Sequence, residues 1–205
     1  MAYRCFLMML ALCSASVTAG QSVPERYEHI AQTHGIPAEV LYAVSLTESA
    51  LSPQAITALL SSATPQSLTT VSRPWPWTIN VAGKGYRYPS RLAAWQALQV
   101  WMKHTPLKRI DVGIAQVNLG WHGQRFASTW AVFDPQENLH VAATLLRDCW
   151  DRRPGSWLNA IGCYHHPAGG KTAARYQAQV QHQLNHVLVA PTLATYWIEP
   201  KEFTP

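Results

Sequence analysis

Acidic residues are scarce in this sequence. Only 11 of its 205 residues are Asp or Glu, and charged residues of both signs make up 13% of the chain, against 48% hydrophobic residues. So apolar a composition argues against disorder over most of the length and suits one globular domain with a sizeable core. With so few carboxylates available, one that interrupts an apolar segment calls for an explanation.

Long hydrophobic runs are also missing. The apolar stretch of residues 5–12 is too short to cross a bilayer, and no other segment is long and apolar enough. Arg4 precedes this stretch and small residues up to Ala19 follow it, which indicates a secretory signal peptide over residues 1–19. The alternatives are a buried first helix, an uncleaved anchor, or a lipoprotein signal at Cys13, which the bulky leucine before it disfavours. We therefore expect an exported, periplasmic and soluble protein.

Cysteine is rare once the signal peptide is removed. Two of the four cysteines leave with it, and Cys149 and Cys163 remain. In an oxidising compartment two remaining cysteines most simply form one disulfide. The competing interpretation is a zinc site that uses Cys163 with His165 and His166, but no paired Cys-x-x-Cys or His-x-x-x-His spacing accompanies these residues. We expect the disulfide and no metal.

The chain has no run of basic residues. Its formal net charge is +5, and the loss of Arg4 with the signal peptide lowers this to +4. Scattered basic residues disfavour nucleic acid as a partner. A mildly basic exported protein instead suits an anionic partner such as a cell-wall polymer or a membrane surface.

Apolar residues at helical spacing predict a mainly α fold. Helices are expected over residues 24–35, 37–49, 90–104 and 171–189, with two more beginning after Asp134 and Ser156, which are both good helix caps. The last helix carries an apolar stripe made of Ala173, Tyr176, Val180, Leu184 and Val187.

Strand periodicity is confined to one segment. Residues 75–88, WPWTINVAGKGYRY, predict a β-hairpin with its turn at Gly83-Lys84-Gly85, and the Ser- and Thr-rich segment 52–73 predicts a loop. We expect one domain over residues 20–189, in which residues 52–110 form an insertion with the hairpin. A tail follows over residues 190–205.

Glu48 is the carboxylate that interrupts an apolar segment, in VSLTESAL at residues 44–51. It follows Val44 by four residues and therefore shares the inward stripe of its helix with Leu41 and Val44. Burial and the nearby helix C-terminus both disfavour a charged carboxylate, so its pKa is expected to be raised, as a general acid requires. The alternative is a frayed helix end in which Glu48 faces water or caps the next turn.

Three short motifs occur in a recognisable order. They are Glu-Ser at 48–49, DVGIAQVN at 111–118 and NAIGCYHH at 159–166. The sequence resembles the lytic transglycosylases with a goose-lysozyme-like (SLT) catalytic domain, particularly the exported forms associated with conjugation and secretion systems. The resemblance covers roughly residues 27–184 and implies a lysozyme-like helical domain with a small hairpin insertion.

The resemblance assigns roles to individual residues. It implies that Glu48 is the catalytic acid and base and that the hydroxyl of Tyr164 orients its carboxyl group. It implies substrate contacts for residues of all three motifs: Ser49, Gly113, where backbone would approach the sugar closely, Gln116, whose amide would bind an acetamido or hydroxyl group, Asn118 and His165. The disulfide between Cys149 and Cys163 would then hold the helix that carries Tyr164 against Glu48.

Two residues depart from the family pattern. Ala115 replaces a methionine, which would remove bulk from the wall of the glycan groove, and His165 replaces an asparagine. The segment between Glu48 and Gly113 is also long for the family. Its aromatic hairpin would line the groove or cover the core: we favour cover for Trp77, and both roles stay open for Trp75, Tyr86 and Tyr88.

The remaining carboxylates favour a mechanism with one catalytic carboxylate. Asp111 is the only second carboxylate beside a motif, and we expect it to hold the turn before Gly113. The resemblance then implies cleavage of the N-acetylmuramic acid–N-acetylglucosamine β-1,4 bond of peptidoglycan to 1,6-anhydromuramyl ends, with no cofactor. The rivals are a hydrolytic muramidase that uses Asp111 as base, and a catalytically weak peptidoglycan-binding module that assembles secretion or conjugation machinery.

Overall fold

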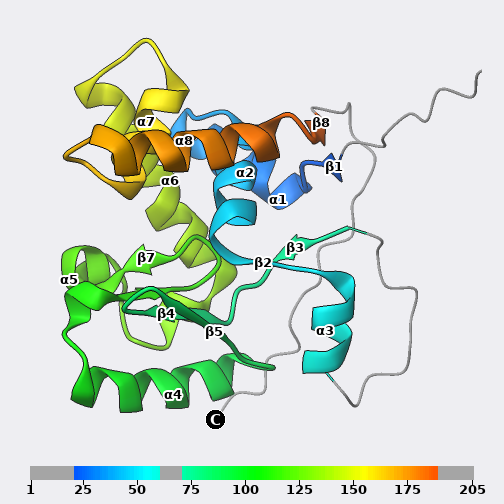
Figure 1. Cartoon of the computed structure of the whole chain (residues 1–205), viewed down its shortest axis with the longest axis vertical. Coiled ribbons are helices and arrows are strands. Elements are labelled where there is room, and N and C mark those ends of the chain that lie inside the picture. The colour runs from blue at the N-terminus through cyan, green and yellow to red at the C-terminus, as the bar shows by residue number, and fades with distance from the viewer. Residues whose placement is uncertain (1–20, 61–70, 189–205) are drawn as a thin grey trace, which may run out of the picture.

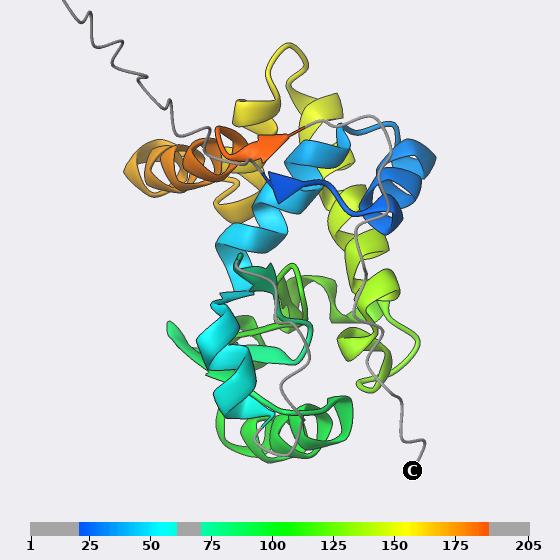
Figure 2. The ribbon, with the colours of Figure 1, turned by 90° about the vertical axis from the view of Figure 1, so that its right-hand side faces the viewer.

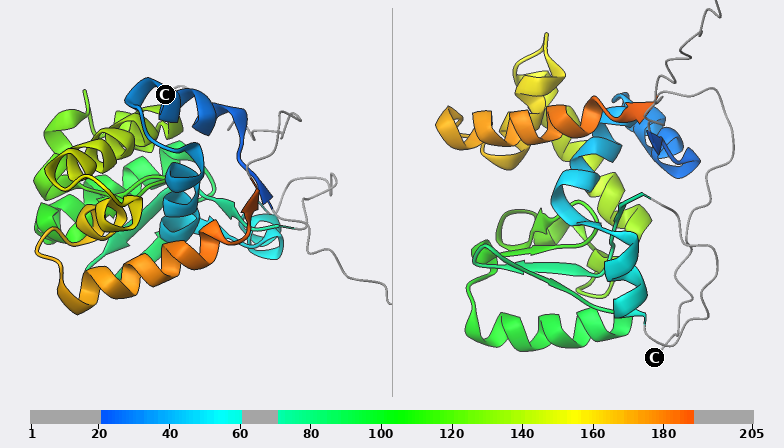
Figure 3. Two further views of the ribbon diagram at one scale, coloured as in Figure 1. Left: turned by 90° about the horizontal axis from the view of Figure 1, so that it is seen from above. Right: turned by 45° about the vertical axis from the view of Figure 1, so that its right-hand side comes forward.

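The computed structural model describes residues 21–60 and 71–188. The expected signal peptide, the tail over residues 190–205 and the middle of the expected loop lie outside these residues. Figure 1 shows two groups of elements, with α2 and α6 running from one toward the other. The helical group contains α1, α2, α6, α7 and α8, and the sheet group contains a four-stranded sheet with α4 (Figures 1 and 3).

The helical group confirms the predicted mainly α architecture. Its members are α1 (Glu25–His34), α2 (Ala38–Ser49), α6 (Pro135–Arg152), α7 (Trp157–His165) and α8 (Gly170–Leu184). Gly35 ends α1 in the left-handed conformation, with φ 61°, which glycine adopts without steric cost. The side chain of Asp134 accepts hydrogen bonds from two backbone N–H groups of the first turn of α6, as its sequence position predicts, whereas Ser156 makes no such bond at α7.

Helix α2 is the centre of the molecule. Every residue from Val40 to Leu46 is buried, so the helix is covered on all sides rather than along one stripe. It packs against α1, α6, α7 and α8, and its last turn points toward the sheet group (Figure 1). The inward stripe inferred from the sequence therefore described only part of a fully buried helix.

The sheet group contains more strands than the sequence predicts. The hairpin is present as β4 (Thr78–Val81) and β5 (Lys84–Arg87), but its turn lies at Ala82-Gly83, where φ is 54° and 91°. Two positive φ values suit a tight hairpin turn, which places the turn earlier than Gly83-Lys84-Gly85.

Two strands that the sequence did not predict complete this sheet. Strand β6 (Ile110–Val112) pairs antiparallel with β4, and β7 (Val117–Asn118) pairs with β6, giving the order β5-β4-β6-β7. Helix α4 (Arg91–His104) packs against β4, within two residues of its expected bounds. The short η1 (Leu107–Arg109) then leads into β6.

The expected loop over residues 52–73 contains a helix. Helix α3 spans Pro53–Leu59, with Ser52 as its N-cap and proline at its first position, which is a start signal that the composition of the segment concealed. Strand β2 (Ala50–Leu51) pairs antiparallel with β3 (Arg73–Pro74). Figure 2 shows α3 beside the sheet group, below the end of α2.

The two ends of the described chain pair with each other. Strand β1 (Gln21–Ser22) runs parallel to β8 (Val187–Leu188), so the last helix ends at Leu184 rather than at the expected residue 189. The segment before α6 holds α5 (Leu119–His122), η2 (Gly123–Arg125) and η3 (Ala131–Phe133). Across residues 21–60 and 71–188, none of the helices combines the length and apolar character needed to span a bilayer.

Candidate active site

Glu48 lies at the junction of the two groups. It is the penultimate residue of α2, and its side chain is 16% exposed, so the carboxylate is largely buried but reaches solvent at one edge. Its Oε1 accepts a hydrogen bond of 2.7 Å from the hydroxyl of Tyr176, and the same oxygen lies 3.9 Å from Nδ1 of His165. Glu48 is thus held by side chains of α7 and α8, not frayed into water.

Tyr176 is the principal partner of Glu48. The sequence placed it on the apolar stripe of the last helix, and its ring is indeed buried, but its hydroxyl points to the carboxylate. Burial and the negative charge of Glu48 both raise the pKa of Tyr176 well above its usual value. The hydroxyl therefore stays protonated and donates to the carboxylate.

The ring of His165 stacks on the ring of Tyr176. The two rings are stacked with centroids 4.1 Å apart and planes within 4° of parallel. Stacking fixes both rings, so the hydroxyl of Tyr176 and Nδ1 of His165 approach the same oxygen of Glu48. The structure therefore brings His165 to Glu48, a contact that the sequence did not predict, and the expected substrate contact of His165 stays a prediction.

Tyr164 does not hold the carboxylate. Its hydroxyl donates a hydrogen bond of 2.7 Å to the backbone oxygen of Ala115 instead. A single hydroxyl proton serves one strong acceptor, so the expected bond from Tyr164 to Glu48 is replaced by that of Tyr176. The pKa of Tyr164 is raised by burial first and then by the charges of Glu48 and Asp111.

Ser49 ties α2 to the loop between β6 and β7. Its side chain is fully buried, and its hydroxyl donates to the backbone oxygen of Ile114 at 2.6 Å and accepts from the backbone N–H of Trp75 at 3.2 Å. These bonds leave Ser49 no access to a glycan. The expected substrate contact of Ser49 is corrected to a structural bond beside Glu48.

The glycine of the second motif is required by the protein interior rather than by a sugar. Gly113 has φ 84°, and a Cβ atom there would lie 2.2 Å from Nδ2 of Asn138 and 2.8 Å from the backbone oxygen of Val132. Ala115 is also fully buried, and its backbone N–H donates to Oδ1 of Asn138. The interior alone therefore requires glycine at position 113, the expected approach of its backbone to a sugar stays a prediction, and Ala115 is too buried to form a groove wall.

The side chains of Gln116 and Asn118 use most of their hydrogen-bonding groups on other parts of the protein. Gln116 has a positive φ of 49°, and its Nε2 donates to the backbone oxygens of Gly113 and Thr78, which leaves its amide oxygen as the acceptor for a substrate. Asn118 uses its whole side chain, since Oδ1 caps α5 and Nδ2 donates to Asp111 and to the backbone of Lys108. The expected sugar contact of Asn118 is corrected to a helix cap.

Asp111 lies in β6 rather than in a turn. Its Oδ1 accepts from Nδ2 of Asn118 at 2.7 Å, which links β6 to the neighbouring strand β7. Burial is the main cause of its raised pKa, and the charge of Glu48 raises it further, while Asn118 and His165 oppose the shift. The two carboxylates therefore interact electrostatically across the junction.

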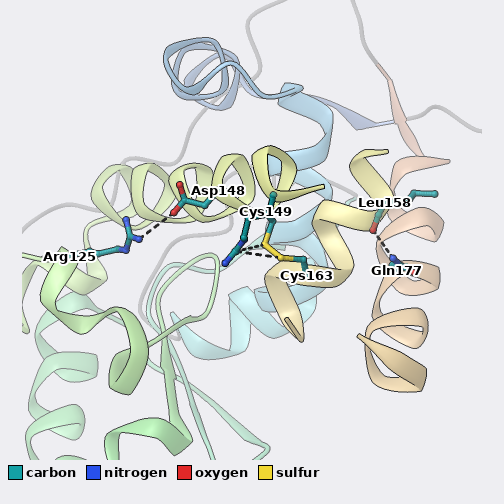
Figure 4. Close-up of a disulfide and its surroundings, with 7 residues drawn as sticks. Arg125, Asp148, Cys149, Leu158, Cys163 and Gln177 are labelled. Atoms are coloured by element: carbon teal, nitrogen blue, oxygen red, sulfur yellow. Dashed lines mark hydrogen bonds and ion pairs between the residues drawn. A yellow bond between two sulfur atoms is a disulfide. The ribbon is translucent and has the colours of Figure 1, made fainter. Parts of the chain in front are cut away.

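The disulfide between Cys149 and Cys163 joins α6 to α7 (Figure 4). Oxidation of Cys163 removes its thiolate from the alternative zinc site, and no group of three metal-binding side chains occurs within the described residues. Gln177 of α8 donates to the backbone oxygen of Leu158 in α7, so the three helices around Tyr164 and His165 are cross-connected (Figure 4).

The aromatic hairpin covers the core. Trp75 and Trp77 are buried, and Nε1 of Trp75 donates to the backbone oxygen of Tyr88. The ring of Tyr86 packs against Trp101. These contacts assign cover to Trp75 and confirm it for Trp77, whereas Tyr86 and Tyr88 are partly exposed and both roles stay open for them.

One exposed aromatic residue was missed in the sequence. Trp121 of α5 is 58% exposed, and Nζ of Lys108 lies 4.1 Å from its ring centroid. Its backbone N–H is capped by Asn118, whose side chain also binds Asp111. The available signal was its place three residues after the second motif.

The chain belongs to the Transglycosylase SLT domain family. The family model matches residues 26–188, which include both groups of elements and every residue of the site around Glu48. Comparison with curated proteins and with solved structures gave no match. Membership points to lytic transglycosylase activity on peptidoglycan and to the lysozyme-like, mainly α fold described above.

Proposed function

We propose that this chain cleaves the β-1,4 bond between N-acetylmuramic acid and N-acetylglucosamine in peptidoglycan and leaves 1,6-anhydromuramyl ends. The observation that carries the proposal is the position of Glu48, which is held by Tyr176 at a solvent-reaching edge between the two groups of a chain of the SLT family. The glycan strand would run along this junction.

Glu48 acts twice in the proposed reaction. As a carboxylic acid it donates its proton to the glycosidic oxygen while the bond from that oxygen to muramyl C1 breaks, and the N-acetylglucosamine leaves with a free hydroxyl. The oxygen of the muramyl C6 hydroxyl then bonds to C1, and its proton passes to the Glu48 carboxylate. The acid is regenerated, and no water is consumed.

The neighbours of Glu48 support these two roles. Tyr176 donates to the carboxylate and fixes its orientation, and His165 stacks on Tyr176 and keeps it in place. The free amide oxygen of Gln116 accepts from a sugar hydroxyl or acetamido N–H. Trp121 offers an exposed ring for a sugar face, and its backbone is tied through the side chain of Asn118 to Asp111.

Mass spectrometry of soluble muropeptides tests the proposal. Purified peptidoglycan is digested with the mature protein and, in parallel, with a Glu48→Gln variant that retains the acceptor for Tyr176 but has no transferable proton. We expect anhydromuramyl products from the wild type and none from the variant. Equal release by both proteins contradicts the role of Glu48, and no release by either favours the peptidoglycan-binding module.

A hydrolytic muramidase is the second candidate, because Asp111 interacts electrostatically with Glu48. In that reaction Asp111 would activate a water molecule. The hydrogen bond from Asn118 instead commits one of its oxygens to the link between β6 and β7. Near-normal turnover of an Asp111→Asn variant, with anhydromuramyl products, would eliminate this candidate.

The proposal includes export. A signal peptide over residues 1–19 and a disulfide between the two remaining cysteines both suit an oxidising, periplasmic setting. A role in secretion or conjugation machinery rests on the resemblance of the motifs alone. Cell fractionation of the full chain beside a variant without residues 1–19 tests export, since only the full chain should reach the periplasm.

A further inference from the structure

A pocket beside Glu48 has no role in the reaction just described. It has a volume of about 210 Å³ and is lined by His165 of α7 and by Lys171, Thr172, Arg175, Tyr176 and Gln179 of α8. Helix α8 packs on α7 and α2 at the outside of the helical group (Figure 3). His165 and Tyr176 are also the two neighbours of the Glu48 carboxylate, so the pocket shares two walls with the candidate active site.

The pocket is cationic. Lys171 and Arg175 lie four residues apart and therefore on one face of α8, with Gln179 one further turn along. Both cations are exposed, and neither forms an ion pair with any acidic side chain among the described residues. By contrast, three other arginines each form an ion pair with an aspartate: Arg91, Arg125 and Arg147.

We infer that this pocket binds a carboxylate carried by the muramyl residue of the substrate. The inference rests on the proposed function, which places a muramyl sugar next to Glu48. Arginine and lysine bind carboxylates through charge-assisted hydrogen bonds, and the hydroxyl of Thr172 and the amide of Gln179 can add neutral ones. The ring wall of His165 and Tyr176 would place this group a short distance from the carboxylate of Glu48.

Two parts of peptidoglycan supply such a carboxylate. One is the peptide stem, which ends in free carboxylates, and the other is the lactyl group, which becomes a free carboxylate when an amidase removes the stem. N-Acetylglucosamine carries neither. The pocket would therefore distinguish muramyl-containing strands from a chitooligosaccharide, which has the same backbone linkage and acetamido groups but no carboxylate.

Binding measurements on the Glu48→Gln protein test this inference without cleavage. Calorimetry is performed with three ligands of equal length: stem-bearing strands, the same strands after amidase treatment, and a chitooligosaccharide. We expect Lys171→Gln and Arg175→Gln, each added to Glu48→Gln, to weaken binding of carboxylate-bearing ligands about three- to tenfold and to spare the chitooligosaccharide. A loss confined to the amidase-treated strands identifies the lactyl carboxylate, a loss confined to the stem-bearing strands identifies the stem, and a loss for both shows that the pocket accepts either carboxylate.

Lys103→Gln, on the exposed face of α4, is the matched control, because it removes one positive charge from the sheet group. It should bind all three ligands as its parent does. The inference is overturned if the two pocket variants bind every ligand like their parent, or if they lose affinity equally for the chitooligosaccharide. If the parent binds none of the ligands and the wild type releases no muropeptides, the proposed function itself fails.

Discussion

At Glu48, the hydroxyl that contacts the carboxylate belongs to Tyr176, whereas the hydroxyl of Tyr164 contacts the backbone of Ala115. Burial raises the pKa of both tyrosines. Sequence motifs identified Tyr164 because it sits in a short recognisable string. Tyr176 looked like a core residue, since only the packing of α8 on α2 shows where its hydroxyl points.

Replacing each tyrosine by phenylalanine should separate their roles. Tyr176→Phe removes a hydrogen bond to a charged group, so the free energy of unfolding should fall by about 1.5–3 kcal/mol, and kcat should fall about 10- to 100-fold because the Glu48 carboxyl loses the contact that orients it. Tyr164→Phe leaves the carbonyl of Ala115 without its donor and should cost about 1–3 kcal/mol of stability. Turnover and urea unfolding measure both; a larger loss of kcat in Tyr164→Phe than in Tyr176→Phe would contradict the assignment.

Asp111 should make stability depend on pH. Its folded-state pKa is raised above the usual value of 3.8, so the native state favours the protonated form. The stabilisation from this group is therefore complete below about pH 4 and is lost as the pH rises through the folded-state pKa. Relative to wild type, Asp111→Asn should gain melting temperature as the pH increases from 4 to about 7.

Asp148→Asn is a suitable control for this measurement, because it removes a negative charge from an exposed ion pair with Arg125 (Figure 4). It should show no comparable gain. A constant difference in melting temperature between Asp111→Asn and the wild type at every pH would show that the carboxyl of Asp111 titrates alike in the folded and unfolded chain.

At the scale of elements, helices were predictable and short strands were not. Helices α1, α2 and α4 lie within two residues of their expected bounds, because caps and apolar spacing are local signals. Strands β6 and β7 have only three and two residues, and β6 is positioned by pairing with the distant β4. No periodicity can develop over so few residues.

The loop between β6 and β7 depends on a residue that no motif signalled. Asn138 of α6 is fully buried, accepts from the backbone N–H of Ala115 and donates to the backbone oxygens of Val112 and Val132. Its side chain therefore supplies hydrogen-bond partners to the backbone on both sides of this loop, whose sequence resembles a glycan-binding motif. A buried asparagine on a helix face reveals its partners only once the fold is known.

Asn138→Ala should destabilise the protein by about 3 kcal/mol, since it removes three hydrogen bonds to buried backbone groups. Chemical denaturation measures the loss directly. Asn159→Ala, at an exposed position of α7, should change stability by no more than about 0.5 kcal/mol. Equal effects of the two substitutions would show that the Asn138 bonds do not hold the loop.

At the scale of the molecule, composition and motif order predicted the fold class. The sequence predicted one apolar, sparsely charged domain with three motifs in order. In the structure this domain consists of a helical group and a sheet group, and Glu48 lies between them. The sequence could not show that most motif residues serve the interior. Ser49, Gly113, Ala115 and Asn118 bind or pack against protein, because the loop must be rigid before Glu48 and Gln116 can be placed.

The disulfide stabilises this arrangement as a whole. Cys149 and Cys163 are 14 residues apart, and a closed loop of about that length is worth about 3 kcal/mol. The double variant Cys149→Ala/Cys163→Ala should therefore melt at a lower temperature, and its turnover should fall because Tyr164 and His165 directly follow Cys163. Added reductant should lower the melting temperature of the wild type but not of the double variant; an unchanged melting temperature in the double variant would contradict the role.

The most direct test of the central claim is digestion of peptidoglycan in water enriched in heavy oxygen. Ring closure by the muramyl C6 hydroxyl under the control of Glu48 uses no solvent, so the released muropeptides should carry no heavy oxygen and should be one water lighter than hydrolysis products. Products that contain one heavy oxygen at the reducing end would show that water attacks the muramyl C1, and would replace the transglycosylase account with a muramidase.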